Sequence, residues 1–84
     1  METKTVVANG NEIVLESMGY SSATPYRCCN TWKGKYRVAS STRPVTDSDI
    51  QALLNDGVFG RGQEVNANLE GEFITYNGFC DSSD

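Results

Sequence analysis

The segment KTVVANGNEIVLES, residues 4–17, constrains the fold more than any other part of the sequence. Asn9 and Gly10 stand between two apolar runs, and both residue types tolerate a positive φ. An Asn-Gly pair in this setting predicts a two-residue turn between antiparallel strands. We therefore expect the chain to open with a β-hairpin and to build an antiparallel sheet on it.

A further strand is predicted over residues 32–38, WKGKYRV. Trp32, Tyr36 and Val38 share one parity, and cations occupy the other. This alternation is typical of a strand with one face in the core and one in water. The cations of the water-facing parity are Lys33, Lys35 and Arg37.

One helix is predicted, over about residues 47–56. Thr46 can cap its N-terminus with Asp49 three residues later, which is close to a capping box. Gly57 suits the left-handed residue that ends a helix. The helix is too short to be stable alone, so we expect it to pack on one face of the sheet. Its apolar stripe consists of Ile50, Leu53 and Leu54.

The remaining segments carry weaker signals. Residues 18–30 lack a clear period and predict a loop, and GVFGRG after the helix predicts a connector. Residues 64–76 predict one strand or two short ones, with Phe73, Ile74 and Tyr76 as core candidates. Asn77-Gly78 predicts a turn into a brief last strand.

The expected fold class is therefore α+β, an antiparallel sheet of four or five strands with one short helix. Residues 1–80 are expected to form a single domain, as the length of 84 residues favours. Residues 81–84, DSSD, are expected to be a frayed acidic tail.

Charge is segregated along the chain. The net charge is −4, yet residues 17–46 hold five basic and no acidic residues, and residues 47–84 hold eight acidic residues against Arg61. Clustered acids steer a protein toward basic partners. The leading hypothesis is a non-enzymatic protein that binds and modulates a larger protein with a basic surface. Phage and mobile-element inhibitors of restriction or CRISPR nucleases share this size and charge. The candidate partner-binding acids are Asp47, Asp49, Asp56, Glu64, Glu70 and Glu72.

A nucleic-acid-binding module is the alternative, with RNA or single-stranded DNA held by the basic strand at residues 33–43. The net negative charge opposes it, and strand parity places Trp32 and Tyr36 opposite the lysines. Acids on neighbouring strands can also pair with these cations: Glu70 and Glu72, or Glu12 and Glu16. A structural subunit joined through exposed sheet edges is a third possibility. The candidate nucleic-acid contacts are Lys33, Lys35, Arg37 and Arg43.

The sequence offers no evident catalytic set, because it has no histidine, and the acid pairs Asp47/Asp49 and Glu70/Glu72 are better explained by helix capping and strand alternation. We expect no enzyme activity, no cofactor and no metal, since the adjacent Cys28 and Cys29 do not have zinc-ligand spacing. With Cys80 they are expected to be free thiols in a reducing compartment, and a bridge to Cys80 is the alternative. No apolar run is long enough to cross a membrane, and a secretory leader is not recognisable, so a cytoplasmic location is expected.

Overall fold

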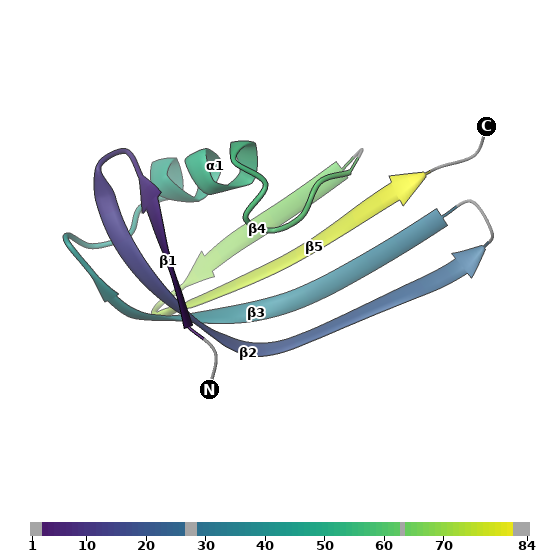
Figure 1. Ribbon diagram of the computed structural model, residues 1–84, viewed down its shortest axis with the longest axis horizontal. Helices are drawn as coiled ribbons and strands as arrows, with labels where there is room; N and C mark the ends of the chain where they lie inside the picture. Colours follow the sequence, from purple (N-terminus) through teal and green to yellow (C-terminus); the bar gives the residue numbers. More distant parts are fainter. Residues whose placement is uncertain (1–2, 27–28, 63, 82–84) are drawn as a thin grey trace.

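The computed structural model describes residues 3–26, 29–62 and 64–81. The five strands form one antiparallel sheet in the order β1-β2-β3-β5-β4, and α1 lies between β3 and β4 in the chain (Figure 1). The sheet and helix confirm the predicted α+β class. The elements are β1 (Thr3–Ala8), β2 (Asn11–Tyr26), β3 (Cys29–Ser41), α1 (Asp47–Asn55), β4 (Glu64–Glu70) and β5 (Phe73–Asp81).

The N-terminal hairpin is confirmed. Ala8 pairs with Asn11 across the turn, and Asn9 and Gly10 have φ values of 53° and 78°. Both turn residues therefore take the left-handed conformation that an Asn-Gly turn requires.

The predicted loop at residues 18–30 is wrong. β2 continues to Tyr26, and its second half pairs with β3 down to Cys29. A register shift explains the failure, because Ser17 pairs with Tyr36 and Gly19 with Lys35, so that Met18 is an extra residue. Such a bulge reverses the parity of the strand beyond it, and the period of two is lost when the sequence is read straight through.

The C-terminal segment forms two strands joined by a tight turn in which Gly71 has a φ of 62°. β5 then runs without interruption through Asn77 and Gly78, so the predicted turn at that pair is wrong. A Cβ on Gly78 would overlap the indole of Trp32. Gly78 therefore stands at this position because the absence of a side chain leaves room for the indole of Trp32.

The helix prediction is confirmed. The Thr46 hydroxyl accepts a hydrogen bond from the Asp49 amide at 3.4 Å, and the Asp49 carboxylate accepts one from the Thr46 amide at 3.1 Å. These two bonds complete the capping box. Asp56 caps the C-terminus, and Gly57 follows with a φ of 78°.

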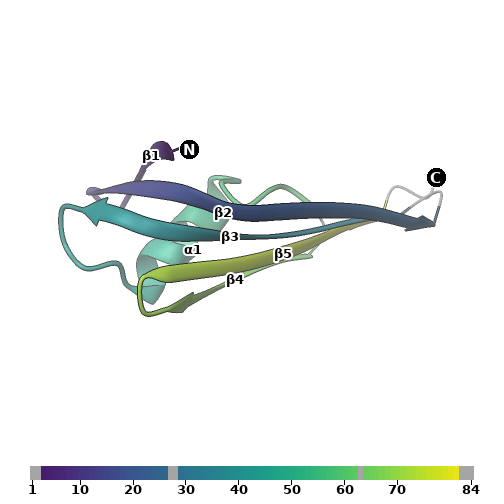
Figure 2. The same cartoon turned by 90° about the horizontal axis from the view of Figure 1, so that it is seen from below.

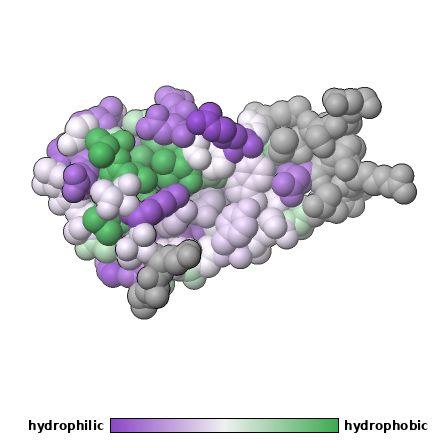
Figure 3. Space-filling model, viewed as in Figure 1, coloured by the Kyte–Doolittle hydropathy of each residue, from purple (hydrophilic) through white to green (hydrophobic). Residues whose placement is uncertain are grey.

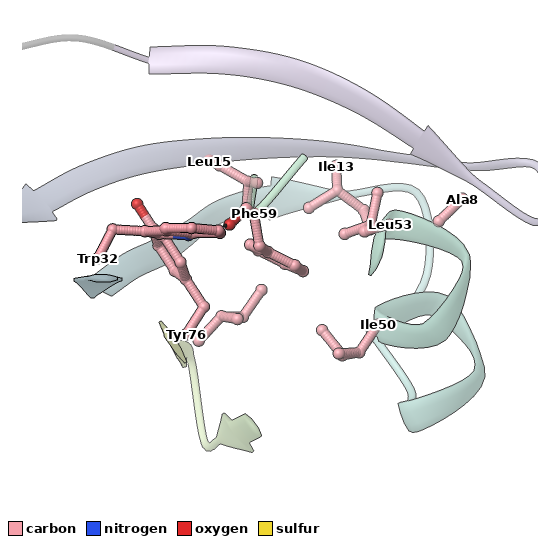
Figure 4. Packing of buried hydrophobic residues seen from close by; sticks show 9 residues of the cluster. Ala8, Ile13, Leu15, Trp32, Ile50, Leu53, Phe59 and Tyr76 are labelled. Atoms are coloured by element: carbon pink, nitrogen blue, oxygen red, sulfur yellow. Dashed lines mark hydrogen bonds between the residues drawn. The ribbon is translucent and has the colours of Figure 1, made fainter. Parts of the chain in front are cut away.

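The core lies between α1 and the sheet. Ile50 and Leu53 of α1 pack in one cluster with side chains of β2 and β5, and Phe59 extends this cluster toward Trp32 and Tyr76 (Figure 4). On the face seen in Figure 3, hydrophobic residues gather around α1 and the β1–β2 hairpin. The buried apolar residues are Ala8, Ile13, Leu15, Trp32, Ile50, Leu53, Phe59, Ile74 and Tyr76.

Two core predictions hold and one does not. Ile74 and Tyr76 are buried, whereas Phe73 is only half-buried. Successive residues of a strand point to opposite faces, so Phe73 cannot share the core face with Ile74.

Figure 2, seen from below, shows the strands in front and α1 behind them. Within the described residues, α1 therefore lies on one side of the sheet, and no helix lies on the other side. Among the described residues, no helix has the length and apolar character needed to span a bilayer.

Candidate binding faces of the sheet

The side of the sheet opposite α1, called the outer face below, is ordered by strand register. Each row on this face consists of four residues that are paired across β2, β3, β5 and β4, and the rows follow one another along the length of the strands. Paired residues in a sheet point to the same face, so each row forms a line of neighbouring side chains. The rows are Glu16–Arg37–Phe73–Glu70, Gly19–Lys35–Thr75–Asn68, Ser21–Lys33–Asn77–Asn66 and Ala23–Thr31–Phe79–Glu64.

The two central rows form what we call the lysine–asparagine patch. Every one of its side chains is exposed, and its lining residues enclose a groove of about 790 Å³. Within these rows the structure places two ammonium groups among amides and hydroxyls, with no carboxylate. The patch consists of Ser21, Lys33, Lys35, Asn66, Asn68, Thr75 and Asn77.

Arg37 lies in the next row and is engaged in ion pairs. Its Nη2 is 3.2 Å from Oε2 of Glu16, and its Nη1 is 3.6 Å from Oε2 of Glu72. Pairing with an acid of a neighbouring strand is therefore confirmed for this cation through Glu16 of β2, and Glu72 lies in the turn between β4 and β5. Lys33 and Lys35 form no ion pair within the described parts of the chain. Of the four predicted nucleic-acid contacts, Lys33 and Lys35 thus have charges on the outer face that no carboxylate of the described residues neutralises.

Arg43 lies away from the patch, beyond the end of β3. Its guanidinium holds Asp49 with both terminal nitrogens, at 2.9 and 3.1 Å from the two carboxylate oxygens. Asn11 and Asn9 each donate a further hydrogen bond to Asp49 at 3.2 Å. These bonds, and above all the one from Arg43, lower the pKa of Asp49 well below its ordinary value, although burial acts in the opposite direction.

The six predicted partner-binding acids do not form one surface. Asp49 is fully buried and is used by the capping box and by Arg43. Asp47 and Asp56 are exposed at opposite ends of α1. Glu64 and Glu70 are exposed at opposite ends of β4, on the outer face, whereas the alternate residues of β4 pack toward the core. Glu72 is paired with Arg37.

Two aromatic side chains on the outer face were missed as functional candidates. Phe73 and Phe79 occupy the rows on either side of the lysine–asparagine patch, and both are half-buried. The Nζ of Lys35 lies 4.3 Å from the ring centroid of Phe73. The signal that could have found them is the alternation in FITYNGF, where residues 73, 75, 77 and 79 share a parity.

Trp32 and Tyr36 lie on the opposite face, as their parity predicted. Trp32 is buried and donates from Nε1 to the carbonyl oxygen of Phe59 at 2.8 Å. Tyr36 stacks on Tyr76 with a centroid distance of 5.2 Å. These rings belong to the side of the sheet that faces α1 and the segment after it.

Metal and thiol chemistry gains no site from these residues. No group of three potential ligands among His, Cys, Asp and Glu occurs within residues 3–26, 29–62 and 64–81. Cys28 lies outside the described residues, as do the side chains of Cys29 and Cys80. Of the predicted tail at residues 81–84, Asp81 is the last residue of β5, and residues 82–84 lie outside the described residues. The pairing of the cysteines therefore stays a prediction.

Comparison of the chain with protein-family models, with curated proteins and with solved structures found no match.

Proposed function

We propose that the protein binds single-stranded nucleic acid on the outer face of its sheet and has no enzymatic activity. The observation that carries this proposal is the lysine–asparagine patch between two half-buried phenylalanines. Proteins that bind single strands without strict sequence preference combine cations for the phosphates with aromatic faces for the bases.

The face offers both kinds of contact at suitable spacing. Phe73 and Phe79 are six residues apart on β5, about 20 Å along the strand. Lys33 and Lys35 lie beside this line, on the neighbouring strand β3. The amides of Asn66, Asn68 and Asn77 can donate to and accept from base edges. A strand of a few nucleotides would cross the patch with its phosphates near the lysines.

The acids at the ends of the face limit the affinity. Glu64 and Glu70 border the patch, and the net charge of the chain is −4, so long-range attraction for a polyanion is absent. We expect a dissociation constant on the order of 10⁻⁵ M at low salt. With two phosphates neutralised, the logarithm of the binding constant should fall with the logarithm of salt concentration with a slope of about −1.4.

Fluorescence anisotropy of a labelled oligothymidine tests the proposal. The double variant Lys33→Glu/Lys35→Glu should weaken binding at least about tenfold, since it replaces both free cations of the patch. The control for net charge compares Lys33→Gln/Lys35→Gln with Gln51→Glu/Asn55→Glu on the exposed side of α1, since these two double variants lower the net charge by the same amount. Equal losses in the two double variants would show that net charge, and not the outer face, governs binding.

The stacking contacts are tested separately. Phe73→Leu and Phe79→Leu keep an apolar side chain at each position but remove the ring. Stacking contributes about 1–3 kcal/mol per base, so each variant should bind about tenfold more weakly with the salt slope unchanged. Unchanged affinity in both variants would show that Phe73 and Phe79 do not stack on the bases.

A basic protein partner is the competing proposal, supported by the exposed acids that remain after Asp49 is set aside. Under it, oligothymidine would not bind, and Asp47→Lys/Asp56→Lys would weaken a partner complex that Lys33→Glu/Lys35→Glu leaves intact. A complex recovered from the native host and resistant to nuclease would favour this alternative.

A further inference from the structure

The face opposite the lysine–asparagine patch contains a second hollow, distinct from the outer face. It has a volume of about 740 Å³ and lies between the start of β1, the segment after α1 and the strands β2, β3 and β5. We call it the aromatic hollow. Its lining includes the side chains that matter for binding: Lys4, Tyr20, Trp32, Tyr36, Arg61 and Tyr76.

The aromatic walls of this hollow are held in place. Tyr36 and Tyr76 are nearly parallel, with 17° between their ring planes, and Trp32 is fixed by its hydrogen bond to Phe59. Gly60 and Gly78 allow this position of Trp32, because a Cβ at either glycine would fall on the indole. A planar ligand would therefore meet rings that need no rearrangement, which lowers the entropic cost of binding.

Part of this aromatic surface is open to solvent. Tyr20 is 64% exposed, and Tyr36 is half-buried. Tyr76 is buried, and its burial, together with the hydrogen bond to Tyr36, raises its pKa above the ordinary value for a tyrosine. The phenol of Tyr76 consequently stays protonated and neutral over the whole physiological range.

The charge of the hollow is opposite to that of the whole chain. The sequence has eleven acidic and seven basic residues, yet the described residues that line the hollow include Lys4 and Arg61 and no acid. Lys4 lies with Nζ 5.0 Å from the ring centroid of Tyr36 and 3.5 Å from the carbonyl oxygen of Val58. Arg61 donates to the carbonyl oxygen of Asp56 at 3.1 Å. Neither cation is neutralised by a carboxylate within the described residues.

We infer that the aromatic hollow binds a small planar aromatic molecule that carries an anionic group. The ligand ring lies against the exposed Tyr20 and beside the edge of Tyr36, since Tyr76 stacks on Tyr36 and Lys4 lies over its ring. The anion is held by Lys4 and Arg61. A nucleotide phosphate and an aromatic carboxylate are two sources of this chemistry. The inference stands apart from oligonucleotide binding, because none of these side chains belongs to the lysine–asparagine patch.

The single tryptophan provides the readout, since Trp32 is the only one in the chain and lines the hollow. The indole N–H signal of the ¹⁵N-labelled protein is followed by NMR during titration with adenosine 5′-monophosphate or with 4-hydroxybenzoate. Adenosine and inorganic phosphate serve as the ring-only and anion-only probes. We expect saturable shifts with a dissociation constant of about 1 mM or tighter for at least one of the two combined ligands. Saturation by only one of them identifies the source of the anion.

The inference is overturned if neither combined ligand saturates the signal, or if adenosine binds as tightly as its monophosphate when that is the ligand. Lys4→Gln and Arg61→Gln should each weaken binding about tenfold, the loss expected for one charge-assisted contact. Gln51→Glu on the exposed side of α1 lowers the net charge by the same amount, lies outside both proposed binding regions, and should leave the affinity unchanged. Equal affinity in all three variants would contradict the assignment of the cations.

Discussion

At the scale of single residues, Asp49 connects more of the fold than any other polar side chain described. Its carboxylate accepts hydrogen bonds from Arg43, from Asn9 and Asn11 of the hairpin and from the Thr46 amide. Only 1% of the side chain is exposed. One carboxylate thus joins the first turn of α1 to the hairpin and to the segment after β3, which explains why an acid is tolerated inside the molecule.

Asp49→Asn should therefore lower the free energy of unfolding by about 2 kcal/mol at pH 7, because an amide directs N–H donors toward groups that are themselves donors. Urea unfolding measures the change. Asp47→Asn, an exposed substitution in the same helical turn, is the control and should have an effect within about 0.5 kcal/mol.

The effect of Asp49→Asn should also depend on pH. A carboxyl group with a lowered pKa stabilises the fold above its unfolded pKa and loses that contribution as the pH falls toward its folded pKa. The difference in stability between wild type and variant should therefore be full at neutral pH and shrink as the pH falls below about 3.8. A difference that stays constant into this acidic range would contradict the role of the Asp49 charge.

At the scale of elements, the sequence predicts the segments in which one local rule operates without interruption. The hairpin and the helix each depend on a turn pair or a capping box, and both are found where predicted. β2 and β5 depend on long-range packing. The bulge at Met18 conceals the period of β2, and Gly78 is fixed by Trp32, a residue 46 positions away in the sequence. Local sequence patterns do not reveal which distant residues pack against a strand.

The continuity of β5 can be tested at this glycine. Gly78→Ala should lower the free energy of unfolding by about 1–3 kcal/mol, since the added methyl group overlaps the indole of Trp32. It should also shift the tryptophan fluorescence as the ring is displaced. Gly19→Ala is the matched control, because a Cβ there has no neighbour within 4 Å. If both variants unfold at the same urea concentration, a residue without a side chain is not needed at position 78 to accommodate the indole of Trp32.

At the scale of the whole molecule, the arrangement of charges in space differs from their arrangement along the sequence. Alternation in β3 correctly separates Lys33 and Lys35 from Trp32, whereas the acids of the second half are divided between α1, the outer face and the interior. The sequence could not predict this division, because it depends on which strands become neighbours. The asparagines and phenylalanines of β4 and β5 join the lysines only through the pairing of β3 with β5.

The most direct test of the account is a map of the oligothymidine contact by ¹H–¹⁵N NMR titration of the wild-type protein. We predict that the largest shifts occur at Lys33, Lys35, Asn66, Asn77 and Phe79, and that the amides of α1 are unaffected. Shifts centred on α1, or no saturable shifts at low salt, would contradict binding on the outer face of the sheet.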